Sequence, residues 1–242
     1  MYDVRFYKGD YKWRQKQANR DKCAAYVEHH FNASANIKSG YSVVVVGYNS
    51  SETSRRWGRW YTSQIAKEFK IAIAGRGGIL IGGYNGRGNG NVKHTNMPAI
   101  LLEPLFVSNP KHAEWVRSTA GQNKLAKVLA TSIIEFFPDG SRIGFSVGHK
   151  YKTSRPQDRG AAVSGGGAEA DYAEIVMEKA KYILENYDPT KEAPVQQEVY
   201  DKPDNDIRVI KDGKELWLHT ETDEDDDIIW DEQNRILYIN TK

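Results

Sequence analysis

The sequence is poor in sulfur: among its 242 residues it has one cysteine, Cys23, and three methionines. A single cysteine excludes a disulfide within the chain and a metal site made of several thiolates. Long apolar runs are missing as well: the longest purely aliphatic stretch is Val43–Val46, whereas a membrane-spanning helix needs ~20 apolar residues. We therefore expect no membrane insertion, and a metal would have to be held by histidine and carboxylate side chains.

The N-terminus lacks the apolar core of a secretory signal, so we expect the chain to be made in the cytoplasm without a signal peptide. The overall composition is ordinary, since apolar residues make up 39% and charged residues 27% of the chain. A chain of this length can form one sizeable core with a small appendage.

An excess of charge of one sign is also absent overall, because the net charge is +2, but the sign changes along the chain. Residues 1–200 carry 28 Lys and Arg against 19 Asp and Glu, whereas residues 201–242 carry 6 against 13. The basic part should attract polyanions, and the acidic tail should not. Because no nucleic-acid recognition motif accompanies the basic residues, we expect no nucleic-acid partner.

Short apolar runs with strand character alternate with segments of helical periodicity. The predicted strands are residues 24–30, 42–48, 78–81, 99–107 and 143–147, and the predicted helices are residues 53–69, 110–137 and 168–187. Strands that alternate with helices predict an α/β domain, with a mostly parallel twisted sheet flanked by helices, over residues 1–188.

The character of the chain changes after this domain. Residues 189–206 are rich in Pro, Glu, Gln and Asp and are interpreted as a linker. Residues 207–242 are predicted to form a small acidic appendage of two β-hairpins in series, with strands at Ile207–Ile210, Glu215–His219, Ile228–Trp230 and Ile236–Ile239. A Lys-Asp-Gly-Lys turn at residues 211–214 supports the first hairpin.

Three positions carry side chains suited to a metal or to acid–base chemistry. His149 follows a short strand, at the end where α/β sheets place their sites, although a surface loop histidine would look the same. Glu169 opens a helix, where the helix dipole alone would also favour an acid. Glu103 interrupts an apolar run, and a carboxylate there is costly unless it is paired, metal-bound or functional.

His29 and His30 end another predicted strand. Adjacent strand residues point to opposite faces, so one of the two at most should face a shared site. A histidine satisfied at a strand end is the alternative. Two histidines and two glutamates suit a catalytic zinc site, with three ligands, an open position for water and a carboxylate base. Spacing alone does not fix the reaction.

Four short motifs surround these residues. Pro-Ala-Ile-Leu-Leu-Glu at residues 98–103 leads into Phe106 and a Ser-Asn pair, and His-Phe-Asn-Ala occupies residues 30–33. Val-Gly-His at residues 147–149 is followed by Asp-Arg-Gly-Ala at residues 158–161, and Glu169 opens the next helix. Together these motifs resemble the zinc-dependent N-acetylmuramoyl-L-alanine amidases of the amidase type 3 family.

The order of the motifs differs from that family, which runs from the Gly-His strand through the Glu helix to His-x-Asn-Ala and the catalytic Glu. Moving residues 141–187 ahead of residue 1 restores the family order, with Tyr2–Phe6 as the strand after the Glu helix. The resemblance therefore implies a circular permutation joined at Pro138–Gly140. Such changes are tolerated because domain termini lie at the surface and often close together.

The resemblance implies that His149, Glu169 and His30 bind Zn²⁺ and that Glu103 is the catalytic base. Its implied substrate is peptidoglycan, cut between N-acetylmuramic acid and L-alanine. Glu28 shares the face of His30 and is expected near the metal. The negative charge that develops on the amide carbonyl oxygen during hydrolysis would be stabilised by an arginine of the glycine-rich loop, either residue 76 or residue 87. The loop Lys150–Gln157 is longer and more basic than the compact turn of the family.

An amidase without a visible signal suggests a phage-type lysin, an endolysin that is released by host lysis or carried in the virion and acts on the cell wall. The alternative is a non-catalytic cell-wall-binding or phage structural module that retains the amidase fold; a zinc peptidase or deacetylase is a third reading. The acidic tail is expected to bind protein, either another copy of the chain in a homo-oligomer or a virion component, unless it simply packs on the basic body.

Overall fold

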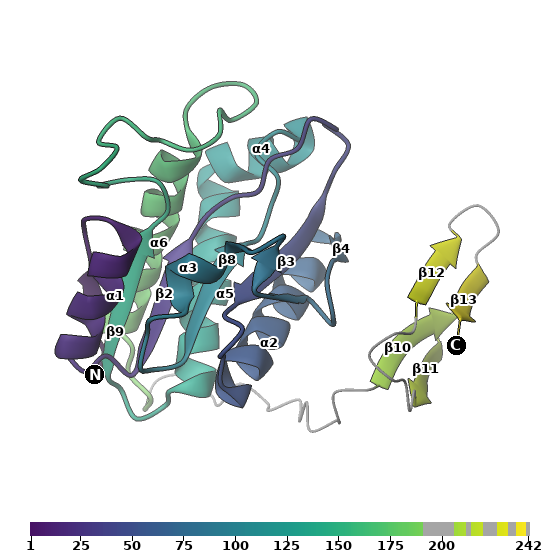
Figure 1. The fold of residues 1–242 in the computed structure, drawn as a ribbon, viewed down its shortest axis with the longest axis horizontal. Coiled ribbons are helices and arrows are strands. Elements are labelled where there is room, and N and C mark those ends of the chain that lie inside the picture. Colours follow the sequence, from purple (N-terminus) through teal and green to yellow (C-terminus); the bar gives the residue numbers. More distant parts are fainter. Residues whose placement is uncertain (191–205, 212–213, 220–226, 232–235, 241–242) are drawn as a thin grey trace. The chain divides into compact units, whose positions relative to one another are not determined.

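A seven-stranded sheet forms the frame of the larger part of the chain (Figure 1). The computed structural model describes residues 1–190, 206–211, 214–219, 227–231 and 236–240. The strands of the large sheet are β1 (Asp3–Phe6), β2 (Ala25–His29), β3 (Tyr41–Val46), β4 (Ala72–Ile73), β5 (Ile79–Ile81), β8 (Ala99–Glu103) and β9 (Arg142–Val147). Their order is β1-β9-β2-β8-β3-β4, and β5 also pairs with β3.

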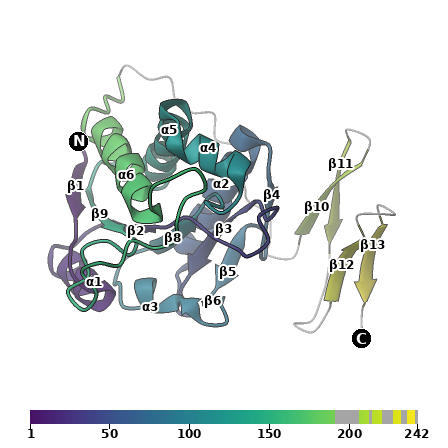
Figure 2. The same ribbon diagram turned by 90° about the horizontal axis from the view of Figure 1, so that it is seen from above.

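The pairings in this sheet are parallel, except for the antiparallel pairing of β3 with β8. Helices cover both faces (Figure 2). One face carries α2 (Glu52–Phe69), α4 (Pro110–Arg117), α5 (Thr119–Phe136) and α6 (Glu169–Glu185). The other carries α1 (Tyr11–Arg20) and α3 (Asn89–Val92), followed along the sheet by the short ladder of β6 (Gly83–Tyr84) with β7 (Arg87–Gly88). The predicted α/β class with a mostly parallel sheet is confirmed.

Two apolar cores explain why the central strands are almost continuously apolar. The larger core lies between the sheet and the four-helix face and includes Trp57, Leu102 and Phe145, each fully buried. The smaller core lies on the opposite face and includes Tyr26 and Leu101. A strand that is buried on both faces has no solvated side and therefore shows no polar alternation.

The helix predicted over residues 110–137 is two helices, α4 and α5. Ser118 separates them: its backbone is extended, and its side chain accepts a hydrogen bond of 3.0 Å from the amide of Gly121. Serine favours this N-cap position because its hydroxyl satisfies an amide that the first helical turn leaves unpaired. The apolar periodicity continues across the break, and so it concealed the boundary.

Helix α1 was not predicted, and its buried face explains the omission. That face consists of Arg14, Gln15 and Ala18, so the segment has no apolar stripe. Arg14 is 1% exposed and donates hydrogen bonds to the carbonyl oxygens of Gly9 and Val147 and to the Ser146 hydroxyl. Hydrogen bonds to a neighbouring strand, rather than apolar burial, fix the helix on the sheet.

The beginning of β1 lies beside the end of α6. The rings of Tyr2 and Tyr187 are 6.1 Å apart, and the amide of Val4 donates a 3.2 Å hydrogen bond to Glu185. The turn that joins α5 to β9 is equally close to the N-terminus, because a Cβ added at Gly140 would lie 2.6 Å from the Met1 nitrogen.

The chain divides into two units, Met1–Gln197 and Glu198–Lys242. In the second unit, β10 (Asp206–Lys211) pairs antiparallel with β11 (Lys214–His219), and β12 (Asp227–Asp231) pairs antiparallel with β13 (Ile236–Asn240). Residues 191–205 of the predicted linker, the Asp-Gly of the predicted turn and the acidic stretch 220–226 lie outside the described residues. Within the described part, none of the helices has both the length and the apolar character to cross a bilayer.

Candidate metal centre

The four residues singled out in the sequence lie at the ends of four elements. His30 follows β2, His149 lies two residues after β9, Glu103 ends β8 and Glu169 opens α6. Strands β9, β2 and β8 are neighbours and run parallel, so their carboxyl ends meet at one edge of the sheet. This edge is where open α/β sheets place ligands.

The side chains of His30, His149 and Glu169 converge at this edge, although up to 139 residues separate them. Their donor atoms all lie within 4.8 Å of one another. His30 Nδ1 is 3.1 Å and His149 Nε2 is 3.5 Å from the same oxygen, Oε1 of Glu169. Two imidazoles and a carboxylate are a donor set that Zn²⁺ accepts.

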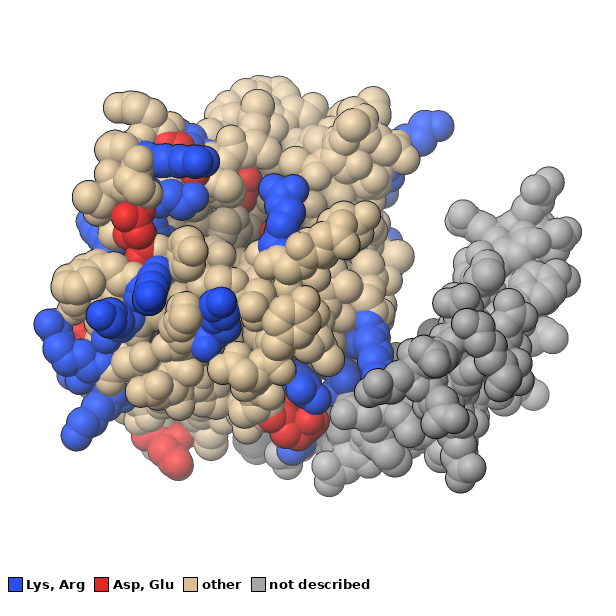
Figure 3. Space-filling view, in the orientation of Figure 1, with Lys and Arg blue, Asp and Glu red and all other residues tan. Residues whose placement is uncertain are grey.

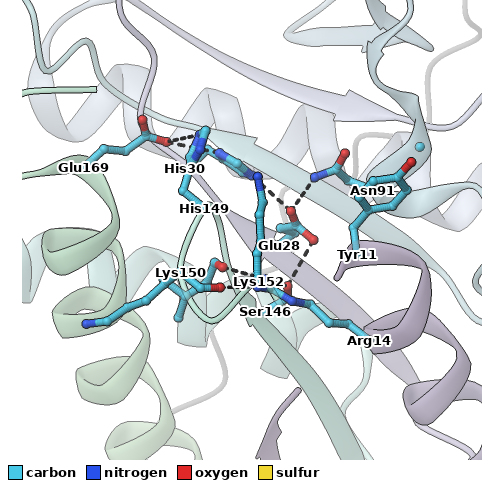
Figure 4. Close-up of polar contacts among 12 residues, drawn as sticks. Tyr11, Arg14, Glu28, His30, Asn91, Ser146, His149, Lys150, Lys152 and Glu169 are labelled. Carbon is cyan, nitrogen blue, oxygen red and sulfur yellow. Dashed lines mark hydrogen bonds and ion pairs between the residues drawn. The ribbon is translucent and has the colours of Figure 1, made fainter. Parts of the chain in front are cut away.

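The second nitrogen of each histidine is bound by a carboxylate outside the cluster. Figure 4 shows this contact for His30 and Glu28. Glu28 Oε1 is 3.1 Å from His30 Nε2, and Asp158 Oδ1 is 2.9 Å from His149 Nδ1. Such partners fix the tautomer and direct the other nitrogen inward, as is usual for metal-binding histidines. The geometry leaves His30 Nδ1 and His149 Nε2 as the inward atoms.

The electrostatic field at this cluster favours a cation. Burial alone would lower the pKa of His30, yet hydrogen bonds to Glu169 and Glu28, together with the charges of Glu28 and Glu103, raise it to about 10. For Glu169 and Glu28, burial opposes the charged form, but the contacts with His30 hold the pKa of each below its ordinary value. The surroundings therefore stabilise a positive charge between the carboxylates, as a divalent ion requires.

Two glycines of the sequence motifs make room for this cluster. A Cβ at Gly148 would lie 2.4 Å from Cε1 of His30, and a Cβ at Gly160 would lie 2.5 Å from Oε2 of Glu169. Gly160 also has a φ of +75°, which side chains rarely adopt. Both motifs therefore need a glycine at these positions, because the donor side chains fill the space that a Cβ would occupy.

Glu28 stands at the centre of a buried polar network. It is 2% exposed and accepts hydrogen bonds from the Ser146 hydroxyl at 3.0 Å and from the Asn91 amide. Arg14 binds the same Ser146 hydroxyl at 2.8 Å. The sequence indicated Glu28 through its register with His30, but it gave no signal for Arg14, because helix α1 itself was not expected.

His29 points to the other face of the sheet. It is fully buried against Phe31, and neither ring nitrogen has a hydrogen-bond partner in the described part of the chain. Burial lowers the pKa of His29 to about 3, so its ring is neutral. Of the two adjacent histidines, His30 belongs to the donor cluster.

Glu103 lies close enough to the cluster to sense its charges. Its Oε2 atom is buried and has no hydrogen-bond partner among the described residues. Burial raises the pKa of Glu103 to about 7. The charge of Glu169 also raises this pKa, whereas the charges of His30 and Arg87 lower it. A carboxylate with an unpaired oxygen and a pKa near neutrality is suited to accept and return a proton.

The segment 3–135 matches the family described as N-acetylmuramoyl-L-alanine amidase. The chain belongs to this family. The matched segment contains His30 and Glu103, whereas His149 and Glu169 lie beyond it. No curated protein matches the chain.

Several solved amidase structures are similar to part of the chain. The catalytic domain of the amidase CwlV from Bacillus (Paenibacillus) polymyxa var. colistinus is 24% identical, with a TM-score of 0.45, over 53% of this chain and 66% of that one. An amidase from Clostridium difficile 630 is 20% identical, with a TM-score of 0.45 and the same coverage. Ami1 from Mycobacterium smegmatis is 19% identical, with a TM-score of 0.46, over 53% of this chain and 60% of that one. The chain thus matches about two thirds or less of these relatives' length.

Proposed function

We propose that this chain is a zinc-dependent peptidoglycan amidase that cleaves the bond between N-acetylmuramic acid and L-alanine. The observation that carries the proposal is the donor cluster of His30, His149 and Glu169, within 4.8 Å, beside the unpartnered carboxylate of Glu103. Family membership supports the reaction class, and the donor chemistry supports Zn²⁺.

In this proposal the three donor side chains hold the ion, while Glu28 and Asp158 bind the outer nitrogens of the two imidazoles and keep the other nitrogens directed inward. Zn²⁺, when bound, supplies Lewis acidity that polarises the amide carbonyl and acidifies the attacking water. Glu103 takes the proton from that water and returns it to the leaving amine of L-alanine. Its raised pKa suits both transfers at neutral pH.

Of the two arginines in the glycine-rich loop, Arg87 is our candidate for the oxyanion. Its charge lowers the pKa of Glu103, so its field reaches the reacting groups. It lies in β7, and the neighbouring Gly88 packs closely on the sheet, since a Cβ there would be 3.1 Å from Val45. A cation held beside the base can stabilise charge that develops on the carbonyl oxygen.

The amidase domain is, in our proposal, circularly permuted. The family match ends at residue 135, and the Gly-His and Glu motifs follow it instead of preceding it. Tyr2 and Tyr187, which the family order would place in one connection, have rings 6.1 Å apart. The turn at Pro138–Gly140 supplies the junction that the rearranged order needs.

A digest of purified peptidoglycan tests the function. An amidase exposes free amino groups on L-alanine, and a peptidase exposes them on other amino acids. A deacetylase releases acetate and exposes amino groups on the sugars of the glycan strand. Stoichiometric zinc without release of any product would favour a non-catalytic cell-wall-binding or phage structural module. The setting that we propose is a phage-type lysin, released by host lysis or carried in the virion. Lysis from outside by the purified protein would support that setting, and failure on every bacterial wall would oppose it.

A further inference from the structure

The loop after His149 and the start of helix α1 enclose an open cleft of about 510 Å³. Its lining includes Lys8, Trp13, Tyr151, Lys152 and Arg159. Figure 3 shows Lys and Arg side chains, with acidic ones between them, on the side where α1 and this loop lie. The lining therefore combines aromatic surface with cationic groups, which is a composition suited to an anionic organic ligand.

The cleft is joined to the metal centre through Asp158. One oxygen of Asp158 lies 2.9 Å from His149 Nδ1, and the other lies 2.8 Å from the ammonium group of Lys152. Lys150, another lining residue, directly follows His149 in the chain. The cleft therefore adjoins residues that hold the metal centre in place.

Most cations of the cleft are already neutralised by acids of the protein. Lys150 pairs with Asp171 at 3.2 Å and also with Glu174. Arg159 pairs with Asp171, and Lys152 with Asp158. These pairs fix the shape of the cleft but leave little net charge for a ligand.

Lys8 is different. Its ammonium group lies 4.2 Å from the centroid of the Tyr151 ring and has no carboxylate within ion-pair distance in the described part of the chain. Glu174, whose pKa its charge helps to lower, is already bound by Lys150 and by the Tyr151 hydroxyl. Among the described residues, Lys8 thus faces the cleft without a carboxylate partner, and the lining also includes Trp13, which is 55% exposed.

We propose that this cleft binds a carboxylate of the peptide stem of peptidoglycan, with Lys8 as its partner and Trp13 as a surface for the peptide. The inference rests on the proposed function. The two sides of the scissile bond differ in charge, because the glycan strand consists of neutral sugars and the peptide stem carries free carboxylates. A polyanion would need a row of unpaired cations, whereas one unpaired lysine fits one carboxylate.

The test uses the full chain, loaded with zinc, and two soluble muropeptides that differ in whether the stem carboxylates are free or amidated. Lys8→Ala should raise KM for the free-carboxylate substrate about fivefold, as expected for one partly exposed ion pair, and leave kcat within about twofold. Lys8→Arg should restore KM. Lys12→Ala, an exposed lysine of α1 that does not line the cleft, is the matched control and should change neither constant.

Amidation of the stem carboxylates provides the second arm of a double-mutant cycle. The wild-type protein should lose about the same factor on the amidated substrate, and Lys8→Ala should lose nothing further. Equal losses for Lys8→Ala on both substrates would overturn the proposal, as would an unchanged KM. Stronger competition by polyphosphate than by the free stem peptide would overturn it in favour of a polyanion site.

A failure of the proposed function gives a different pattern. If the wild-type protein hydrolyses neither muropeptide, calorimetry with the free stem peptide still decides the inference. Binding that is about fivefold weaker with Lys8→Ala supports the cleft, and binding equal to that of wild type removes it.

Discussion

At Glu103, one buried oxygen lacks a partner and the pKa is raised to about 7 by burial. We expect Glu103→Gln to keep the fold and the zinc content but to lower hydrolysis on the order of 10²–10⁴-fold, because the amide cannot accept a proton. Free amino groups released from peptidoglycan and zinc content by atomic absorption measure the two effects. Glu178→Gln, at an exposed position of α6, is the control. Near-normal turnover by a zinc-loaded Glu103→Gln variant would exclude Glu103 as the base.

The adjacent histidines give a second prediction at the same scale. His30→Ala removes a donor and should abolish stoichiometric zinc binding. His29→Leu should keep zinc, because the His29 ring nitrogens have no partner and point to the other face. Zinc titration with a competing chelator compares the two variants. Loss of zinc with His29→Leu but not with His30→Ala would show that the assigned strand register is wrong.

At the scale of elements, the positions of the main strands could be predicted and their arrangement could not. His30 and His149 each end or follow an apolar run, so the sequence placed them at the carboxyl ends of strands. Glu103 was predicted inside a strand over residues 99–107, but β8 ends at Glu103, just before Pro104, which cannot donate a backbone hydrogen bond to a neighbouring strand. The order β1-β9-β2-β8-β3 and the antiparallel pairing of β3 depend on contacts between distant segments, which periodicity does not record. Helix α1 was missed because its buried face is polar.

Helix α4 contributes a pH-dependent term to stability through His112. This residue is 3% exposed and its Nδ1 accepts a 3.2 Å hydrogen bond from the amide of Phe106, which requires the neutral ring. Burial, together with the charge of Lys111, lowers the pKa of His112 to about 4. As the pH falls from about 6.5 to 4, the unfolded chain gains a proton that the folded chain does not, and stability should fall by up to roughly 3 kcal/mol.

The variant His112→Asn separates this term from the others. Its side-chain oxygen can accept the same hydrogen bond but does not titrate. Urea unfolding at pH 7 and at pH 4.5 should show a smaller difference for the variant than for the wild type, whatever its absolute stability. Equal differences would mean that His112 is protonated as easily in the folded chain as in the unfolded one.

On the scale of the whole molecule, the neighbouring positions of Tyr2 and Tyr187 allow the proposed permutation to be reversed. We expect a chain that starts at Ser141, runs to Tyr187, continues through a short linker into Tyr2 and ends at Pro138 to fold and bind one zinc ion. The chain truncated after Asp188 is the reference. Circular dichroism, zinc content and hydrolysis should agree between the two. Opening the relinked chain at Leu125, inside α5, should prevent folding, and failure of the Ser141 opening alone would argue against the proposed order.

The acidic unit after the linker should bind protein and not the cell wall, because residues 201–242 carry 6 basic against 13 acidic residues. Removing residues 189–242 is expected to leave sedimentation with purified walls unchanged and to weaken self-association or binding to a virion component. Analytical ultracentrifugation and wall pull-down measure both. A truncated chain that keeps its oligomeric state but no longer sediments with walls would identify a wall-binding module instead.

The place of β9 in the sheet has a consequence for synthesis. This strand lies between β1 and β2, yet both of those leave the ribosome more than a hundred residues earlier. Until residues 142–147 emerge, β1 has no neighbour and β2 presents an open edge, which is a surface that invites pairing with other chains. The same delay keeps His30 apart from His149 and Glu169. A growing chain therefore lacks the complete donor cluster until residues 149 and 169 have been made, well after His30.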